Sequence, residues 1–368
     1  MKPAFRIPAF LLSCLLVATL VGCGGGGGGG VSGGSSPTAG APPAGGAANN
    51  PGQPIDTPTV PEDPQASVTP YKVFAVVPGE MLIASFSNAN PLPGSAVSAR
   101  TIRPFAGIVG MPGKHLAYDA ASDALYATIG ASIIVIDHAS KASGDVAPSR
   151  VITVPSAVVK LSSYLVYDKD RDVLWLGGEG TKNGMLVKIG RASTARGAVT
   201  PDKVYQLREP RAFSIDTQRN LVYALESTIG VHVYDLATLQ DTTVLPDNQQ
   251  NQPTRDMFFP GLNIGSDIAL DMANNRIYAV DGFGAMVVVD NASASSGAVA
   301  YAKFILSMPQ SVTFDPATDR LYVGGGSNDV TIFNQASRLS MGSPVPAVSV
   351  FGPRVTPGSS AVWGITFP

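Results

Sequence analysis

The chain contains few of the residues on which most catalytic and metal sites are built. It has two cysteines and three histidines among 368 residues, and only 14% of its residues are charged. Both cysteines, Cys14 and Cys23, lie near the N-terminus, so the rest of the chain has neither a disulfide nor a thiol. This excludes cysteine nucleophiles and thiolate metal sites there, and it leaves burial of apolar side chains to hold the fold.

An excess of positive charge is also missing. The chain has 25 basic and 27 acidic residues, and removal of an N-terminal segment containing Lys2 and Arg6 would leave 23 basic residues. Proteins that neutralise phosphates carry a basic excess, so we expect no nucleic-acid partner.

The N-terminus has the pattern of a signal sequence. Lys2 and Arg6 give the chain a positively charged start, and a short apolar stretch, Ile7 to Val21, follows them. This stretch is too short to span a bilayer comfortably. It ends in Leu20-Val21-Gly22-Cys23, which resembles the lipobox of bacterial lipoproteins at all four positions. The resemblance implies that residues 1–22 are a lipoprotein signal peptide and that Cys23 carries fatty acyl chains such as palmitate.

Two alternatives for this segment are an ordinary secretory signal with an incidental Cys23 and an uncleaved membrane anchor. The glycine run Gly24 to Gly30 argues against the anchor, because glycine continues a helix poorly. Two or three acyl chains would hold the protein at the membrane. Gly24 stands where an aspartate would favour the inner membrane, so the lipoprotein resemblance favours the outer membrane, on its periplasmic or surface side.

A spacer follows the cysteine. Residues 23–66 are, after Cys23, almost wholly small and polar residues with Pro and Gly, and they contain no aromatic side chain. Such a segment buries too little apolar surface to offset its ordering entropy. We therefore expect a flexible linker there, and a folded body over residues 67–368.

The folded body contains an internal repeat. Five segments share an apolar residue and an Asp, an acidic residue or Asn four positions later, an aliphatic residue at plus six and an aromatic one at plus seven. The copies are Tyr118-Asp119 with Asp123, Leu125 and Tyr126; Tyr167-Asp168 with Asp172, Leu174 and Trp175; Ile215-Asp216 with Asn220, Val222 and Tyr223; Leu270-Asp271 with Asn275, Ile277 and Tyr278; and Phe314-Asp315 with Asp319, Leu321 and Tyr322.

Each unit is typical of a β-propeller blade. A strand ends at the Asp, whose side chain can accept hydrogen bonds from backbone amides two residues on, and the aliphatic-aromatic pair begins the next strand. A third, β-branched strand follows, as in Ile133 to Asp137, and then a glycine six residues before a basic residue, as in Gly144 and Arg150. The repeat predicts an all-β fold with four antiparallel strands per blade.

The number of blades depends on the two ends of the body. Residues before the first full unit supply only the second, third and fourth strands of a blade, and the C-terminal Gly364-Ile365-Thr366-Phe367 resembles the first strand of the last unit. We therefore predict six blades, with the ring closed by the C-terminal strand. Seven blades are the alternative if the insertion Thr243 to Asn263, which has the composition of a polar loop, contains a further unit.

The units resemble bacterial extracytoplasmic propellers of the NHL and YVTN kinds. Leu125-Tyr126-Ala127-Thr128, followed by Ile133 to Asp137, is similar to the YVTN phrase and its following "VID". The resemblance covers about residues 70 to 368. It implies blades and no particular activity, since members bind proteins, carbohydrates or small ligands and some related propellers are lactonases.

Other motifs favour structural roles. The histidines His115, His138 and His232 are expected just before a first strand, just after a third strand and within a third strand, so they should not meet at a zinc ion. Asp168 to Asp172 resembles a calcium loop but lacks its glycine, and we expect a turn. Gly177-Gly178 and Gly324-Gly325-Gly326 are expected in hairpin turns between second and third strands. No Gly-x-Ser-x-Gly elbow occurs, and we identify no catalytic residue, metal site or cofactor.

Ligands of propellers usually contact the face formed by the loops entering the first strands and the loops between strands two and three. The candidate ligand-binding residues on this face are His115, Tyr164, Arg211, Asp267, Gln310 and Trp363 from the first set of loops, and Glu179, Glu226 and Asp281, with Glu80 and Asn328, from the second. Solvated rim residues are the alternative.

Two functions follow from this pattern. The first is a monomeric, membrane-tethered module that binds an unidentified protein or small molecule. The second is a tethered, lactonase-like hydrolase with a divalent cation, which requires Glu80, Glu179, Glu226, Asp267 and Asp281 to converge.

Overall fold

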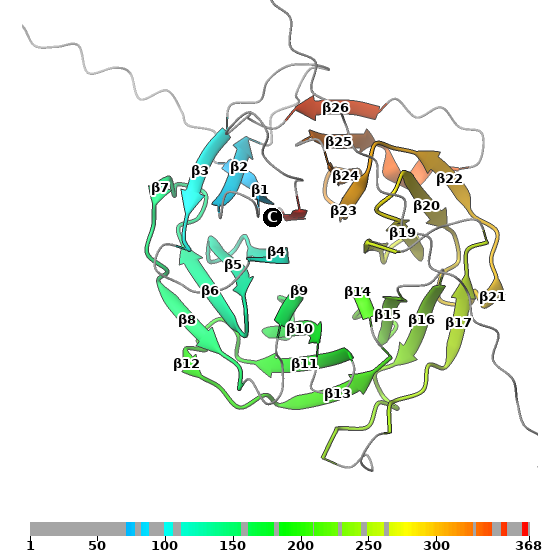
Figure 1. Ribbon diagram of the computed structural model, residues 1–368, viewed down its shortest axis with the longest axis horizontal. Coiled ribbons are helices and arrows are strands. Elements are labelled where there is room, and N and C mark those ends of the chain that lie inside the picture. The colour runs from blue at the N-terminus through cyan, green and yellow to red at the C-terminus, as the bar shows by residue number, and fades with distance from the viewer. Residues whose placement is uncertain are drawn as a thin grey trace, which may run out of the picture. The chain divides into compact units, whose positions relative to one another are not determined.

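The computed structural model describes residues 71–77, 82–87, 99–105, 112–155, 161–179, 184–208, 210–226, 230–243, 249–260, 265–326, 329–340, 347–351 and 363–366. Residues Asp63–Pro368 form one compact unit. The strands of the described residues form six sheets, which stand as blades around a ring (Figure 1). This confirms the six-bladed β-propeller. Cys23 and the rest of residues 1–70 lie outside the described part of the chain.

The blades share one strand order. The first, innermost strands are β27 (Trp363–Thr366), β4 (Pro112–Asp119), β9 (Leu161–Asp168), β14 (Pro210–Asp216), β18 (Asp267–Asp271) and β23 (Pro309–Asp315). The second strands are β1 (Tyr71–Val77), β5 (Ala124–Ile129), β10 (Val173–Glu179), β15 (Leu221–Glu226), β19 (Arg276–Val280) and β24 (Arg320–Gly325). The third strands are β2 (Leu82–Ser87), β6 (Ser132–Asp137), β11 (Gly184–Gly190), β16 (Gly230–Asp235), β20 (Ala285–Val289) and β25 (Asp329–Asn334). The fourth, outermost strands are β3 (Ala99–Arg103), β8 (Arg150–Thr153), β13 (Lys203–Leu207), β17 (Arg255–Phe258), β22 (Ala302–Ile305) and β26 (Ala347–Phe351).

The repeated Asp forms the predicted turn. Each complete first strand from β4 to β23 ends at this residue, and in three blades its carboxylate accepts the amide two residues on, as Asp119 does from Ala121 at 3.0 Å. In the other two blades the amide is three residues on, as with Asp168 and Arg171 at 3.2 Å. The segment from Asp168 to Asp172 is therefore a turn of the repeat.

The acidic residue or Asn four positions later has a backbone reason that the pattern alone did not reveal. All five copies have positive φ, between 51° and 60°, where an Asp or Asn is tolerated better than most residues. In four blades its side chain also accepts from the amide of a serine in the loop after the third strand, as Asp319 does from Ser337 at 2.8 Å. The turn after strand one is thereby fastened to the loop after strand three.

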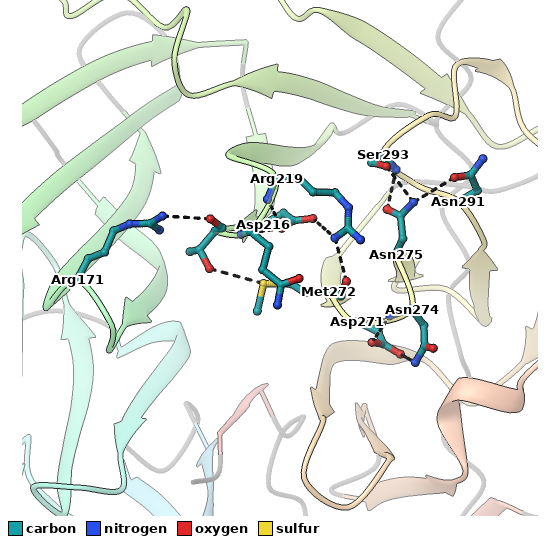
Figure 2. A network of polar contacts seen from close by, with 11 residues as sticks. Arg171, Asp216, Arg219, Asp271, Met272, Asn274, Asn275, Asn291 and Ser293 are labelled. Atoms are coloured by element: carbon teal, nitrogen blue, oxygen red, sulfur yellow. Dashed lines mark hydrogen bonds and ion pairs between the residues drawn. The ribbon is translucent and has the colours of Figure 1, made fainter.

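Neighbouring blades are joined at the same rim. Figure 2 shows Arg219, whose guanidinium contacts Asp216 and the backbone oxygen of Met272 in the next blade, both at 2.9 Å. Arg171 makes the equivalent contact one blade earlier, to the backbone oxygen of Thr217 at 3.1 Å. Both arginines lie three positions after the repeated Asp.

The glycine that follows the third strand of a unit, and the basic residue six positions after that glycine, also join blades. Gly144, Gly197 and Gly297 have positive φ and begin the two-residue strands β7 (Gly144–Asp145), β12 (Gly197–Ala198) and β21 (Gly297–Ala298). Each pairs in parallel with the outermost strand of the preceding blade, so it covers an open edge. Arg150 then donates to the backbone oxygens of Ala192 and Ala195 in the following blade.

Two expectations about strand boundaries were wrong. Gly177 and Gly178 lie within β10, and Gly324 and Gly325 lie within β24, not in hairpin turns. A Cβ on Gly177 would approach the ring of Phe213 to 2.4 Å, so this glycine is required for close packing of two blades. The insertion from Thr243 to Asn263, predicted to be a polar loop, contains the strand β17. The pattern did not indicate this strand, because two of its four residues are charged.

The C-terminal strand closes the ring as predicted. β27 pairs antiparallel with β1, with Phe74 opposite Thr366 and Ala75 opposite Ile365 (Figure 1). The helical structure within the described residues is a single 3-10 turn, Ala336–Arg338, and none of it is a candidate for a membrane-spanning helix.

The closure predicts a specific loss of stability. Deleting residues 363–368 removes β27 and exposes the edge of β1, whereas deleting residues 367–368 leaves the strand in place. At about 1 kcal/mol for each lost backbone hydrogen bond, we expect the longer deletion to lower the free energy of unfolding by about 3 kcal/mol. Urea denaturation measures this, and equal stability of the two variants would contradict the role of β27.

Candidate functional site

The first strands surround a central cavity of about 290 Å³. Its lining includes runs of consecutive residues, such as His115 to Tyr118 from β4 and Ile268 to Leu270 from β18. Consecutive side chains of a strand point to opposite faces, so consecutive residues can line one cavity only where the strand presents its backbone edge. The wall of the cavity is therefore formed largely by the unpaired backbone edges of the innermost strands.

These edges are irregular at the end where the strands begin. Five innermost strands have a register shift there, at Pro112/Leu116, opposite Gly177/Gly178, at Pro210/Ala212, at Pro309/Ser311 and opposite Ala75/Val76. Arg211 and Gln310 are the extra residues of two such bulges. A β-bulge redirects side chains and interrupts pairing, so it turns polar groups toward the opening.

The position of one set of candidate residues differs from the prediction. His115, Tyr164, Arg211, Asp267 and Gln310 lie within first strands, not in the loops before them. Bulges explain the difference for His115, Tyr164, Arg211 and Gln310, because their strands resume pairing on the far side of each irregularity. Asp267 is the first residue of β18, which pairs with β19 in unbroken register. We call these five residues the channel mouth, because they lie near the start of the strands that surround the central cavity.

Asp267 occupies the centre of the channel mouth. It is 1% exposed, and its carboxylate accepts from the backbone amides of Ile268 at 2.7 Å and Val312 at 2.8 Å. His115 approaches it from the opposite blade, with Nε2 2.9 Å from Oδ1, although the ring is not aligned for a straight hydrogen bond. This pair spans the channel, and both oxygens of Asp267 are in use.

Aromatic and cationic groups complete the channel mouth. Tyr164 packs edge-on against His115, with ring centroids 4.8 Å apart. Burial and the nearby Asp267 raise the pKa of its hydroxyl far above the ordinary range, and Arg211 acts in the opposite direction. The pKa of Lys114 is lowered, mainly by burial and further by Arg211, while Asp267 acts in the opposite direction. Arg211 itself is exposed. The sequence reading missed Lys114, although its position beside His115 could have indicated it.

Gln310 connects the channel mouth to the next loop. Its amide donates to the backbone oxygen of Gly282 at 3.0 Å, and its own backbone oxygen accepts from Ser266 at 2.9 Å. Asp281 lies in that loop, where one carboxylate oxygen accepts the amides of residues 283, 284 and 285 at 2.8–2.9 Å. Asp281 therefore organises its hairpin, and it is 3% exposed.

Glu226 ends β15 and belongs to a separate group on the blade of β14, β15, β16 and β17. Its Oε2 lies 3.2 Å from Nε2 of His232, whose Nδ1 lies 2.5 Å from Asp256. His232 is 4% exposed and within a third strand, as expected. The prediction that the histidines are separated also agrees with the structure, since His115 pairs with Asp267 and His138 follows β6.

The remaining candidates cannot be placed as side chains. Glu80 and Asn328 lie outside the described residues, and for Glu179 and Trp363 only the backbone, in β10 and β27, is described. Of the five carboxylates required by a metal-dependent hydrolase, Glu226, Asp267 and Asp281 make the three separate sets of contacts given above. Across the described part of the chain, no three His, Cys, Asp or Glu side chains are grouped to hold a metal ion.

The contacts of Asp267 predict its contribution to stability. Asp267→Asn keeps the shape of the side chain but removes the charge and turns an amide donor toward a group that now donates to Asp267. We expect the free energy of unfolding to fall by about 1–3 kcal/mol, as for a buried hydrogen-bonding group that loses a partner. Urea denaturation measures this, with exposed Asp170→Asn as the control, and identical midpoints would contradict the assignment.

Comparisons with known proteins identify no family for the chain. No protein-family model matches the chain, and no curated protein matches it significantly. Among solved structures, the chain is similar to one titled "Crystal structure of Nidogen/Laminin Complex", with a TM-score of 0.49 and 15% sequence identity, over 80% of this chain and 97% of that chain. The six sheets of the chain itself define it as a β-propeller.

Proposed function

We propose that the chain is a lipid-anchored extracytoplasmic propeller of the NHL/YVTN kind that acts as a monomeric binding or scaffold module, and that it contacts its partner through the channel mouth. The observation that carries the binding role is the difference between the two rims of the ring. At the rim of the turns, the blades repeat the same residues. At the channel mouth, the position four residues before the repeated Asp holds five different residues, namely His115, Tyr164, Ala212, Asp267 and Ser311. Arg211 and Gln310 are the bulge residues directly before two of them.

This difference has a physical reason. A residue that serves the fold meets the same surroundings in every blade, so the same chemistry recurs, as with the Asp and Ser of the turns. A ligand that lies across the axis meets each blade from a different side, so it favours different side chains at equivalent positions.

The anchor is proposed from the sequence. Leu20 to Cys23 supports acylation of Cys23, and the Gly- and Pro-rich linker over residues 23–66 would hold the propeller away from the lipid. The charge balance supports a protein or small-molecule partner rather than nucleic acid. We propose the outer membrane as the location.

The binding role predicts position-dependent crosslinking in cells. A photoreactive residue replacing Gln310, at the channel mouth, should give a defined crosslinked product when full-length protein is irradiated in intact cells. The same group replacing Arg196, which is exposed in the loop after a third strand at the opposite rim, is the matched control. Products at both positions, or at neither, would contradict binding through the channel mouth.

The anchor predicts a different experiment. Cells grown with an alkyne analogue of palmitate should label the wild-type protein, and Cys23→Ser should abolish the label and release the protein from the membrane fraction. Cys14→Ser is the matched control, because that residue lies in the proposed signal peptide. Labelling of Cys23→Ser at the wild-type level would overturn the lipoprotein assignment.

A further inference from the structure

The ring exposes large apolar side chains at the same end as the channel mouth. Three such side chains are Phe283, Ile305 and Met308, which are 62%, 78% and 55% exposed. They belong to the blade of β18, β19, β20 and β22 or to its connection with β23. We call them the rim patch. Phe283 lies in the loop between strands two and three, Ile305 ends the fourth strand, and Met308 lies in the loop that enters β23, so all three share the end of the ring where the first strands begin.

The backbone that carries the rim patch is held in a fixed conformation. The amide of Phe283 is one of the three that bind the buried carboxylate of Asp281. Ile305 is paired with Ala285 in the adjoining strand, and Met308 has a φ of 44°, which is strained for a residue with a side chain. A backbone fixed in this way loses little entropy when a partner covers the side chains that it carries.

Two loops of the rim patch are bonded to the channel mouth. The amide of Gln310 contacts the backbone oxygens of Gly282 and Met308, at 3.0 and 3.4 Å, and thereby joins the loop of Phe283 to the loop of Met308. Ser266, which donates to the backbone of Gln310, directly precedes Asp267. Hydrogen bonds of Gln310 therefore connect the loops of Phe283 and Met308 to the strand that begins at Asp267.

The exposed charge of the channel mouth is positive. Arg211 is the exposed residue among its five, and Lys114, directly before His115, is half-buried. Both Asp267 and Arg211 act on the pKa of Lys114. Asp267 already binds two backbone amides and His115, and it is almost completely buried. A ligand therefore meets the exposed Arg211 and the half-buried Lys114 rather than the carboxylate.

We propose that the partner is a protein segment that carries a carboxylate beside a bulky apolar side chain. The carboxylate binds Arg211 and Lys114, and the apolar side chain covers the rim patch. This inference rests on the proposed binding role of the channel mouth and specifies its ligand. Arginine suits carboxylates because its guanidinium can donate two parallel hydrogen bonds.

Two other occupants fit less well. A second copy bound symmetrically would apply the same surface to itself and bring cationic groups of the two channel mouths together. An anionic membrane could contact the rim patch, but a flat surface does not reach Lys114, which lies half-buried beside the His115–Asp267 pair. A chain segment reaches both.

Selection from a library of random linear peptides on the immobilised full-length protein tests the proposal. The selected sequences should combine Asp or Glu with a bulky apolar residue, and fluorescence anisotropy then gives their Kd for each variant. Arg211→Glu should weaken binding about tenfold or more, and so should the triple change Phe283→Ser, Ile305→Ser and Met308→Ser.

Matched variants separate the proposed contacts from general effects. Arg196→Glu makes the same charge change at the opposite rim and should leave Kd unchanged. Phe283→Leu with Met308→Leu keeps the rim patch apolar and should retain binding. Urea midpoints identify a variant that is destabilised, and Arg211→Glu, which changes an exposed side chain, remains decisive if the triple variant unfolds.

Four results would overturn the inference. These are selected peptides without acidic residues, binding that the triple variant retains at full folded stability, concentration-dependent dimerisation in analytical ultracentrifugation that Phe283→Ser abolishes, and binding to anionic phospholipid vesicles that the peptides fail to compete. Position-dependent crosslinking at residue 310 together with any of them would leave the binding role standing and reject only this ligand class.

Discussion

Five of the six blades depend on one backbone conformation, the left-handed residue that opens the second strand. An Asp or Asn supplies it in all five complete units, because these side chains tolerate positive φ and can bind nearby amides. The same side chain fastens a serine of the following loop in four blades. The contacts of Arg171 and Arg219 then pass from blade to blade at this rim (Figure 2). The interactions that define the blade are thus concentrated at one end of the first strands, and the other end is free to vary.

The ring leaves a second constraint unresolved, the open backbone edges of its innermost strands. Three of the six outer edges in the described part of the chain are covered, by β7, β12 and β21, and β27 closes the seam. The inner edges face the central cavity. Asp267 satisfies two of their amides with one carboxylate, and this brings a negative charge to the axis. His115 from the opposite blade contacts that carboxylate, so a requirement of the backbone explains why polar side chains gather at the channel mouth.

The sequence was sufficient for the fold because the fold is repetitive. The Asp of each turn recurs at spacings of 44 to 55 residues. The C-terminal Ile365 and Thr366 match the pattern of a first strand, which is the strand that the N-terminal blade otherwise lacks. The site was harder to predict, since bulges have no repeated sequence signal and they shift His115 and Arg211 from the expected loops into strands. β17 was missed because its charged residues interrupt the apolar pattern, and the glycines of β10 were misplaced because the ring of Phe213, distant in sequence, requires them.

The departures from the repeat also indicate where function belongs. Local rules agree with the fold along most of this chain, and sites where they fail are commonly functional or strained. Met308 is held at positive φ, Phe283, Ile305 and Met308 are exposed, and Asp267 is buried at the axis, all at the same end of the ring. The turns at the opposite end contain residues that recur in blade after blade and are accounted for by hydrogen bonds within the fold. An asymmetric ligand is the simplest physical reason for a symmetric scaffold to concentrate its unlike residues at one end.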